Sequence, residues 1–213
     1  NFNLSEILTH IGHSEKVLFM RIFLSVLILI FSFQSSTKAD DISKFEIEGM
    51  SVGDSLLYHF NKKKILKRKK KNQFPKSDKY IISTFYEDSF NIYESVSISY
   101  ENNKKFIIGN IEGRIFFKNN IQECLKKRIE ISDAIEASLE NVKKKDFKKN
   151  HGFDPTGNSK YISTSFEFQS LGNIQVSCTD WSTEIENKGF SDELKVSIAS
   201  SKFRIFLDEE AFE

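Results

Sequence analysis

The residue with the clearest potential for covalent chemistry is Ser55, in the tetrapeptide Gly53-Asp54-Ser55-Leu56. A serine hydroxyl acts as a nucleophile when a base, usually a histidine held by a carboxylate, lies within hydrogen-bond reach and when donors face the oxyanion that forms. The last histidine of the chain is His151, far from the C-terminus, and no aspartate lies three residues before it. The sequence therefore contains a candidate nucleophile without a matching late acid–base pair.

The same four residues match the signature of the GDSL (SGNH) hydrolases, in which the serine follows a buried first strand. This resemblance implies that Ser55 would be the nucleophile of a serine hydrolase. The family also carries a Gly-x-Asn-Asp block and a late Asp-x-x-His block, and neither occurs here. Glu46 and Glu48 stand where a buried parallel strand would be continuously apolar. A hydrolase is therefore the third of our hypotheses, and the sequence favours a protein that is not an enzyme.

The two cysteines, Cys124 and Cys178, both fall on apolar faces of their predicted elements. In an oxidising compartment such a pair can form a disulfide that ties a helix to a sheet. Closing a loop of this size contributes about 4 kcal/mol when it is treated as a loss of chain entropy in the unfolded state. The alternative is two buried free thiols. No metal site is expected, because two cysteines without a nearby histidine offer too few ligands, and no cofactor is expected either.

The N-terminal part of the chain has the pattern of an export signal. In residues 20–39, Met20 and Arg21 form a short positive end, an apolar stretch follows, and small residues near Ala39 suit cleavage. The apolar stretch is shorter than the roughly 20 residues of a membrane-spanning helix; a membrane anchor or a buried helix is the alternative. Residues 1–19 are predicted to be an upstream leader outside the fold, and residues 40–213 a single exported domain, soluble in the periplasm or secreted.

The predicted exported domain carries equal numbers of acidic and basic side chains, which argues against a dedicated nucleic-acid binder. Its cations are unevenly spread, because eight of the ten residues 62–71 are basic. The candidates for contact with an anionic surface or a lipid headgroup are Lys62, Lys63, Lys64, Lys67, Arg68, Lys69, Lys70 and Lys71. The alternative is a solvated loop, because runs of like charge repel one another and stay mobile.

Strands and helices must position these residues. Alternation of apolar and polar residues predicts strands at 80–86, 95–100, 106–118, 161–169, 173–181 and 193–199. Apolar residues at helical spacing predict helices at 51–60, 121–147 and 201–212, with a strand as the alternative for the last. The lysines at 143–149 would then lie near the end of the second helix, where cations favour the helix dipole.

The fold class that follows is α+β. Short connections between strands favour antiparallel neighbours, so we expect an antiparallel β-meander sheet with helices packed on one face. The order of helix, three strands, helix, three strands is compatible with an α-β-β-β pseudo-duplication. His151 and Trp181 are aromatic residues that such a fold could place at a binding surface; an exposed histidine and a core tryptophan are the alternatives.

Segments 47–57, 124–127 and 178–181 carry a wider resemblance, to uncharacterised secreted proteins of streamlined marine bacteria, and this group implies no activity. Gly49-Met50-Ser51, a helix with Leu56-Leu57 and then a meander are similar to the opening of SmpA/BamE-like outer-membrane assembly proteins. This chain departs from those in being longer and in lacking a lipid-attachment cysteine. Together with the absence of a complete catalytic set, these features predict a non-catalytic exported domain that binds another envelope protein. An anionic-surface binder is the alternative.

Overall fold

The computed structural model describes residues 42–213 with the exception of 71–72, 119, 140 and 213. The predicted leader (1–19) and the predicted signal peptide (20–39) lie outside the described residues. Within the described part, no helix is both long enough and apolar enough to cross a membrane.

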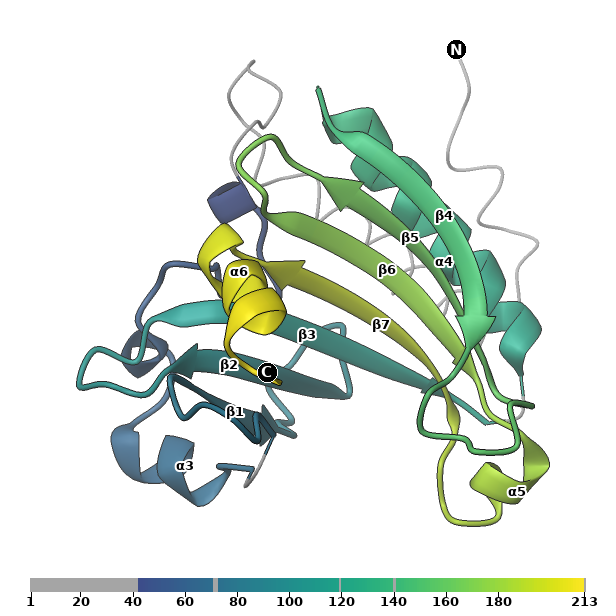
Figure 1. Cartoon of the computed structure of the whole chain (residues 1–213), viewed down its shortest axis with the longest axis horizontal. Coiled ribbons are helices and arrows are strands. Elements are labelled where there is room, and N and C mark those ends of the chain that lie inside the picture. The colour runs from purple at the N-terminus through teal and green to yellow at the C-terminus, as the bar shows by residue number, and fades with distance from the viewer. Residues whose placement is uncertain (1–41, 71–72, 119, 140, 213) are drawn as a thin grey trace, which may run out of the picture. The chain divides into compact units, whose positions relative to one another are not determined.

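Seven antiparallel strands form one sheet in the order β1-β2-β3-β7-β6-β5-β4 (Figure 1). Their bounds are Tyr80–Phe85 (β1), Ser95–Glu101 (β2), Ile108–Phe117 (β3), Lys143–Asn150 (β4), Lys160–Glu167 (β5), Asn173–Asp180 (β6) and Asp192–Ala199 (β7). Two meanders, β1–β3 and β4–β7, are joined where β3 pairs with β7. The predicted antiparallel sheet and six of its strands are confirmed; β4 is the strand that the alternation does not predict.

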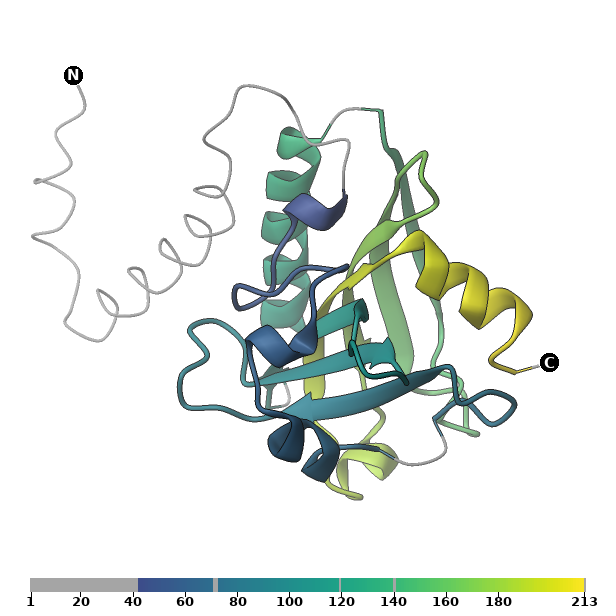
Figure 2. The same cartoon turned by 90° about the vertical axis from the view of Figure 1, so that its left-hand side faces the viewer.

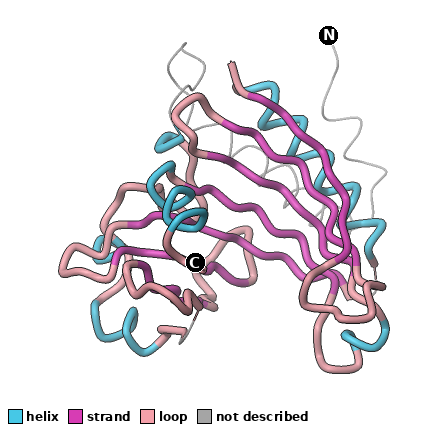
Figure 3. Tube along the Cα trace, in the orientation of Figure 1, coloured by secondary structure: helices cyan, strands magenta, loops and turns pink. Residues whose placement is uncertain are grey.

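Helices connect and flank these strands (Figure 3). They are η1 (Ile42–Lys44), η2 (Leu56–Tyr58), α3 (Lys62–Lys67), α4 (Ile121–Ser138), α5 (Thr183–Glu186) and α6 (Ser201–Glu209). The side chain of Asn120 accepts a hydrogen bond from the backbone N–H of Glu123 and so caps α4. Ser200 caps α6 in the same way, through the N–H of Phe203. The last segment is therefore the predicted helix, and the strand alternative is wrong.

The two faces of the sheet differ because side chains alternate along each strand. On one face, a row of cross-strand neighbours is apolar and at most 3% exposed: Ile98, Ile111, Ile198, Ile174 and Phe166. α4 packs on this face against β5, β6 and β7 (Figure 2). The adjacent row on the other face is polar: Ser97, Glu112, Ser197, Gln175 and Ser165. We call this second surface the polar face.

α6 packs at one end of the polar face, on the opposite side of the sheet from α4 (Figures 1 and 2). The rings of Phe203 and Phe206 lie 5.0 Å and 4.8 Å from the ring of Tyr80. Gly109 makes room for this contact, because a Cβ there would lie 3.2 Å from the Cβ of Phe203. The prediction that helices cover only one face is therefore wrong, since β1 places an aromatic side chain on the polar face and α6 buries it.

The predicted helix 121–147 is wrong beyond Ser138. Leu139 is already extended, with φ −108° and ψ 150°, and Asn141 has a left-handed φ of 56°, which reverses the chain. Lys143–Asn150 then pairs along β5 as β4. Its lysines do not mark a helix end. They lie on an edge strand, where charged side chains on both faces are tolerated because one side of the strand meets solvent.

Three further expectations differ from the structure. Segment 51–60 is a series of turns around η2 rather than a full helix, and Gly49 and Gly53, with φ of 74° and 96°, shape those turns. Segment 62–71 begins as a helix, α3, because Asn61 caps it by accepting from the N–H of Lys64 at 2.9 Å. The α-β-β-β pseudo-duplication is not confirmed: α3 precedes the three strands of the first meander, but four strands follow α4, with α5 between the last two.

Candidate functional site

Ser55 is engaged in local structure. Its hydroxyl donates to the carbonyl of Lys105 at 2.7 Å and accepts from the backbone N–H of Leu57 at 3.3 Å. Neighbouring Asp54 accepts from the backbone N–H of Ser51. Among the described residues, no hydrogen bond joins Ser55 to a histidine or to a carboxylate. The serine caps η2 and ties this turn to the chain that leads into β3.

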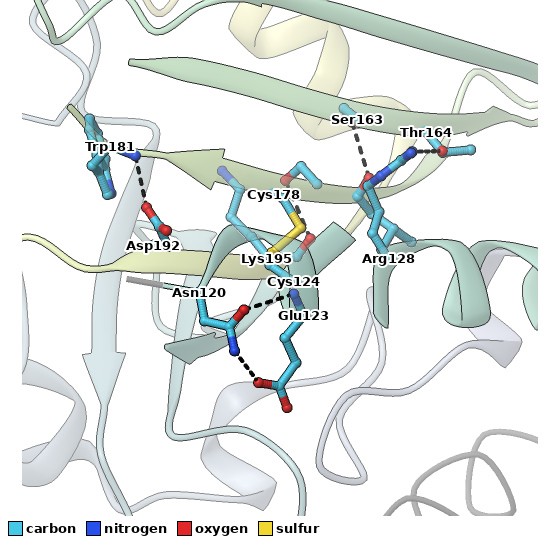
Figure 4. Close-up of a disulfide and its surroundings, with 12 residues drawn as sticks. Asn120, Glu123, Cys124, Arg128, Ser163, Thr164, Cys178, Trp181, Asp192 and Lys195 are labelled. Atoms are coloured by element: carbon cyan, nitrogen blue, oxygen red, sulfur yellow. Dashed lines mark hydrogen bonds between the residues drawn. A yellow bond between two sulfur atoms is a disulfide. The ribbon is translucent and has the colours of Figure 1, made fainter. Parts of the chain in front are cut away.

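Cys124 and Cys178 form a disulfide, with their Cα atoms 6.0 Å apart. Figure 4 shows that the bond joins the first turn of α4 to β6, across the apolar face of the sheet. One turn further along the helix, Arg128 reaches β5 and donates to the hydroxyl of Thr164. The predicted pairing of a helix cysteine with a sheet cysteine is confirmed. It locks α4 to the sheet and leaves the polar face without such a cover.

The cations at the start of segment 62–71 lie over aromatic rings and a carboxylate. Lys64 pairs with Glu87 at 2.6 Å, and its ammonium lies 5.2 Å from the centroid of the Phe60 ring. Lys62 lies 6.0 Å from the centroid of the Phe106 ring. These lysines therefore pack α3 against the first meander.

The cations at the end of this segment follow the outer edge of β1. The N–H of Lys70 donates to the carbonyl of Ile82 at 2.8 Å, and Lys69 forms a β-bridge with Ser83. Lys70 also lies in the electrostatic field of the polar face, where burial is the main cause that lowers its pKa and Arg114 adds to the effect. Lys71 lies outside the described residues. The predicted candidates are thus spread over α3 and the β1 edge.

Four charged side chains cluster at the centre of the polar face, where β3 meets β7. Arg114 contacts Glu112 at 2.6 Å and Glu193 at 3.6 Å, and it donates to the hydroxyl of Ser97 at 2.7 Å. Lys195 lies 3.9 Å from Glu112. Each of the four side chains is 19–23% exposed. We call Glu112, Arg114, Glu193 and Lys195 the charged cluster.

The two acids of the charged cluster have pKa values displaced in opposite directions. Burial raises the pKa of Glu112, but Lys195 and Arg114 outweigh it and hold this pKa below its ordinary value. Burial also raises the pKa of Glu193, and here it prevails over Arg114 and Lys195. Glu112 in turn is the main cause that raises the pKa of Lys195. Half-buried groups with divergent pKa values occur at binding sites and also in structural ion-pair networks.

A chain of ring contacts extends from the charged cluster toward α5. We call it the aromatic band: Phe147, Tyr161, His151, Trp181, Phe190 and Phe153. Lys195 and Lys149 lie 5.9 Å and 5.6 Å from the centroid of the Tyr161 ring, so cations line this ring. The band therefore begins at the charged cluster and continues across the ends of β4, β5 and β6.

The far end of the aromatic band is open to solvent. Phe153 and Phe190 are 58% and 40% exposed, with ring centroids 5.2 Å apart. The ring of Trp181 contacts both of these rings and is only 8% exposed. Trp181 is therefore a core tryptophan, which was the alternative to a binding-surface residue. An exposed pair of phenylalanines on a rigid support is typical of a contact surface for another molecule.

The loop between β4 and β5 is held by Asp154. Its carboxylate accepts hydrogen bonds from the N–H and hydroxyl groups of both Thr156 and Ser159, and from the hydroxyl of Ser182. These bonds hold the pKa of Asp154 well below its usual range. The same loop carries His151, whose Nδ1 accepts from the N–H of Phe153. Burial is the main cause that lowers the pKa of His151, and nearby lysines add to it.

The charged cluster and four rings of the aromatic band are candidate residues that sequence reasoning missed; of the band, it named only His151 and Trp181. A signal for the cluster was present, because Glu112–Arg114 and Glu193–Lys195 are charged pairs two positions apart, and the neighbouring positions Ile111, Ile115, Leu194 and Val196 are apolar. The aromatic band as a whole had no such signal, since its members come from two strands, β4 and β5, and from the β4–β5 and β6–β7 connections.

The polar face offers charge pairing at its centre and ring contacts at one end.

Within the described residues, no group of three or more histidine, cysteine, aspartate or glutamate side chains is placed to hold a metal ion. Comparisons with protein-family models, with curated proteins and with solved structures found no match to this chain.

Proposed function

We propose that this protein is a non-catalytic exported domain that binds another exported protein through the polar face of its sheet. One observation carries the proposal. The apolar face is closed by α4 and its disulfide, whereas the polar face carries half-buried charges and exposed phenylalanines and, within the described residues, is covered by a helix only at its α6 end.

The chemistry of the polar face suits a protein partner. Charges of both signs, Glu112 and Glu193 with Arg114 and Lys195, favour a partner with a complementary pattern rather than a uniformly charged surface. Exposed aromatic rings such as Phe153 and Phe190 supply anchors of the kind that dominate protein interfaces. The disulfide supports a location in an oxidising compartment.

Site-specific crosslinking tests this function. A photoreactive amino acid at Gln175 or Ser197, on the polar face, is expected to capture one defined exported protein in the producing cells. The matched control places it at Lys126, on the solvent side of α4, where no product is expected. Arg114→Glu should abolish the products from the polar face. Equal capture from both surfaces, or none from the polar face, would overturn the proposal.

The enzyme alternative is tested separately with a serine-reactive probe. If the probe labels the wild-type protein but not Ser55→Ala, the protein is a serine hydrolase and the proposal of a non-catalytic domain is wrong. The mass of the exported protein, measured with and without reductant and alkylation, tests the export signal as well, because it reports the mature N-terminus and the state of both cysteines.

A second candidate function is contact with an anionic membrane surface through α3. The observation that favours it is Leu66, which is 47% exposed beside exposed lysines of the same helix. If this is the function, the protein binds vesicles containing phosphatidylserine, and Lys63→Glu/Lys67→Glu abolishes that binding. Binding that is unchanged in the variant, or that persists at high salt, would exclude it.

A further inference from the structure

The two edge strands of the sheet, β1 and β4, differ in whether another segment of the described chain pairs with them. The edge at β1 is covered, because the Lys70 N–H donates to the Ile82 carbonyl and the Thr84 N–H donates to the Arg68 carbonyl. The other edge is β4, the last strand of the sheet (Figure 1). An edge strand directs every second pair of N–H and C=O groups away from its only neighbour, and these groups can pair with another extended chain.

β4 is well formed for such pairing. It spans eight residues, as many as the interior strands β5, β6 and β7. It contains neither proline nor glycine, and its register with β5 is unbroken from Lys143 opposite Glu167 to Asn150 opposite Lys160. Proteins usually blunt an edge by shortening it, bulging it or inserting proline. β4 has none of these features, and among the residues that the structure describes, its charged side chains are the only protection of this edge.

The charge on β4 is predominantly positive. Five of its eight residues are lysines, three on the polar face and two on the α4 face: Lys143, Lys145, Lys149, Lys144 and Lys148. Its one acid, Asp146, already contacts Arg128 and accepts from Thr164. A second copy of β4 would bring lysines opposite lysines, which is unfavourable. An extended segment rich in aspartate and glutamate would be complementary to Lys143, Lys145 and Lys149 on the polar face and to Lys148 on the α4 face, where Lys144 already pairs with Glu136.

Phe147 adds an apolar contact at the middle of this edge. It is half-buried, stands on the polar face between Lys145 and Lys149, and packs on Tyr161 with ring centroids 6.0 Å apart. A strand added beside β4 would place one side chain directly opposite this ring. The edge thus combines backbone pairing groups, cations on both faces and one central aromatic ring.

We infer that β4 is the docking edge for an extended acidic segment of the partner protein, which adds to the sheet as a further antiparallel or parallel strand. This inference rests on the proposed function, because it names the partner chemistry and the way in which the partner continues the polar face. Backbone hydrogen bonds supply the pairing, and the lysines select acidic sequences over basic ones and over a second copy of this chain.

The experiment uses a fluorescent synthetic peptide of about ten alternating Glu and Thr residues and the full exported domain. Binding is expected and should weaken as salt is raised. Hydrogen exchange should slow at alternate amides of β4 and remain unchanged in α3. A peptide of alternating Lys and Thr is expected not to bind. The same acidic peptide with N-methyl groups on alternate residues should bind at least about tenfold more weakly, because it cannot donate to the edge.

Variants separate the edge from the other basic surface. Lys145→Glu/Lys149→Glu is expected to weaken the acidic peptide at least about tenfold, whereas Lys63→Glu/Lys67→Glu in α3 has the same charge change and should leave it unchanged. All four side chains are exposed, and thermal melting confirms that both variants fold.

Three results would overturn the inference: undiminished binding of the N-methylated peptide, loss of binding only in the α3 variant, or a β4-dependent dimer in sedimentation. The polar-face crosslinks distinguish the two proposals. If the wild type gives these crosslinks but does not bind the acidic peptide, or if the crosslinks persist undiminished in Lys145→Glu/Lys149→Glu, the edge inference fails and the proposed function stands. If the wild type gives no polar-face crosslinks, the proposed function fails.

Discussion

At the scale of single residues, carboxylates that accept several hydrogen bonds organise the loops of this protein. Glu48 accepts hydrogen bonds from the backbone N–H groups of Asn91, Ile92 and Tyr93. This contact holds the buried ring of Tyr93 over Gly113 in β3. Asp154 likewise accepts hydrogen bonds from the backbone N–H groups of Thr156 and Ser159, in the loop that carries His151 and Phe153. In both places one acid satisfies several amide donors that the strands leave unpaired.

The contact between Tyr93 and Gly113 predicts a cost for any side chain at that glycine. A Cβ at Gly113 would lie 2.5–2.7 Å from atoms of the Tyr93 ring. Gly113→Ala should therefore lower the free energy of unfolding by about 1–3 kcal/mol. Gly152→Ala is the matched control, because nothing lies within 4 Å of its Cβ position, and it should change stability by less than about 0.5 kcal/mol. Urea unfolding measures both, and equal effects would contradict the packing described.

Asp154 predicts a pH dependence. Its folded-state pKa lies below its unfolded value, so its contribution to stability is present above the unfolded pKa and is lost as the pH falls below about 4. Asp154→Asn, which places an amide among hydrogen-bond donors, should lower Tm by at least a few degrees at pH 7. The difference between wild type and variant should shrink as the pH approaches 2. A difference that stays constant down to pH 2 would show that the carboxylate charge has no part in it.

At the scale of elements, the disulfide fixes α4 on the apolar face, and α6 is held on the opposite face by aromatic packing. The sequence allowed the first of these contacts to be predicted, because Cys124 and Cys178 each continue an apolar pattern of their own element. It did not allow the second, because an amphipathic helix such as α6 can bury Phe203 and Phe206 against any apolar surface within reach. Tyr80 supplies that surface only after β1 has joined the sheet.

Removing the disulfide should have a large effect on stability. The bond closes a loop with a sequence separation of 54 residues, and the Cys124→Ala/Cys178→Ala variant should unfold with a free energy lower by about 4 kcal/mol. Reduced wild type is the control and should match the variant in urea unfolding. A loss below about 1 kcal/mol would mean that α4 is held by packing alone.

At the scale of the whole described domain, the pairing of β3 with β7 joins the two meanders, and the charged cluster lies on that junction. Glu112 and Arg114 belong to the first meander, and Glu193 and Lys195 to the second. Sequence reasoning predicted the strands that carry these residues. It could not place the cluster, because the i, i+2 spacing only shows that two charges share a face and does not say which strand lies beside them.

Arg114 is expected to couple the two meanders. Arg114→Met removes its contacts to Glu112, Glu193 and Ser97, and we expect a loss of about 2 kcal/mol, because it leaves Glu193 charged and half-buried. Adding Glu193→Gln should restore part of this loss. Chemical unfolding of the single and double variants measures the coupling. If the double variant is as unstable as the sum of both single variants, the pair is not coupled.

The stability of Arg114→Met should also depend on pH, through the protonation of Glu193. The folded-state pKa of Glu193 is raised, so the folded protein takes up this proton before the unfolded chain does. Protonation of Glu193 therefore adds stability as the pH falls toward the ordinary pKa of a glutamate. The effect should be larger in Arg114→Met, where the positive neighbour is gone, and absent when Glu193 is replaced by glutamine.

The sequence by itself determined the antiparallel α+β class and six of the seven strands, and it favoured the capped C-terminal helix and the cysteine pair over their alternatives. These features depend on local periodicity and on capping residues, which act within a few positions of one another. Only the tertiary structure decided that Lys143–Asn150 is an edge strand rather than the end of a helix, that α6 lies opposite α4, and that the charged cluster and aromatic band share one face. The physical reason is that strand order and edge position depend on contacts between distant segments, and a run of lysines is compatible with a helix end, a loop or a strand until its neighbours are in place.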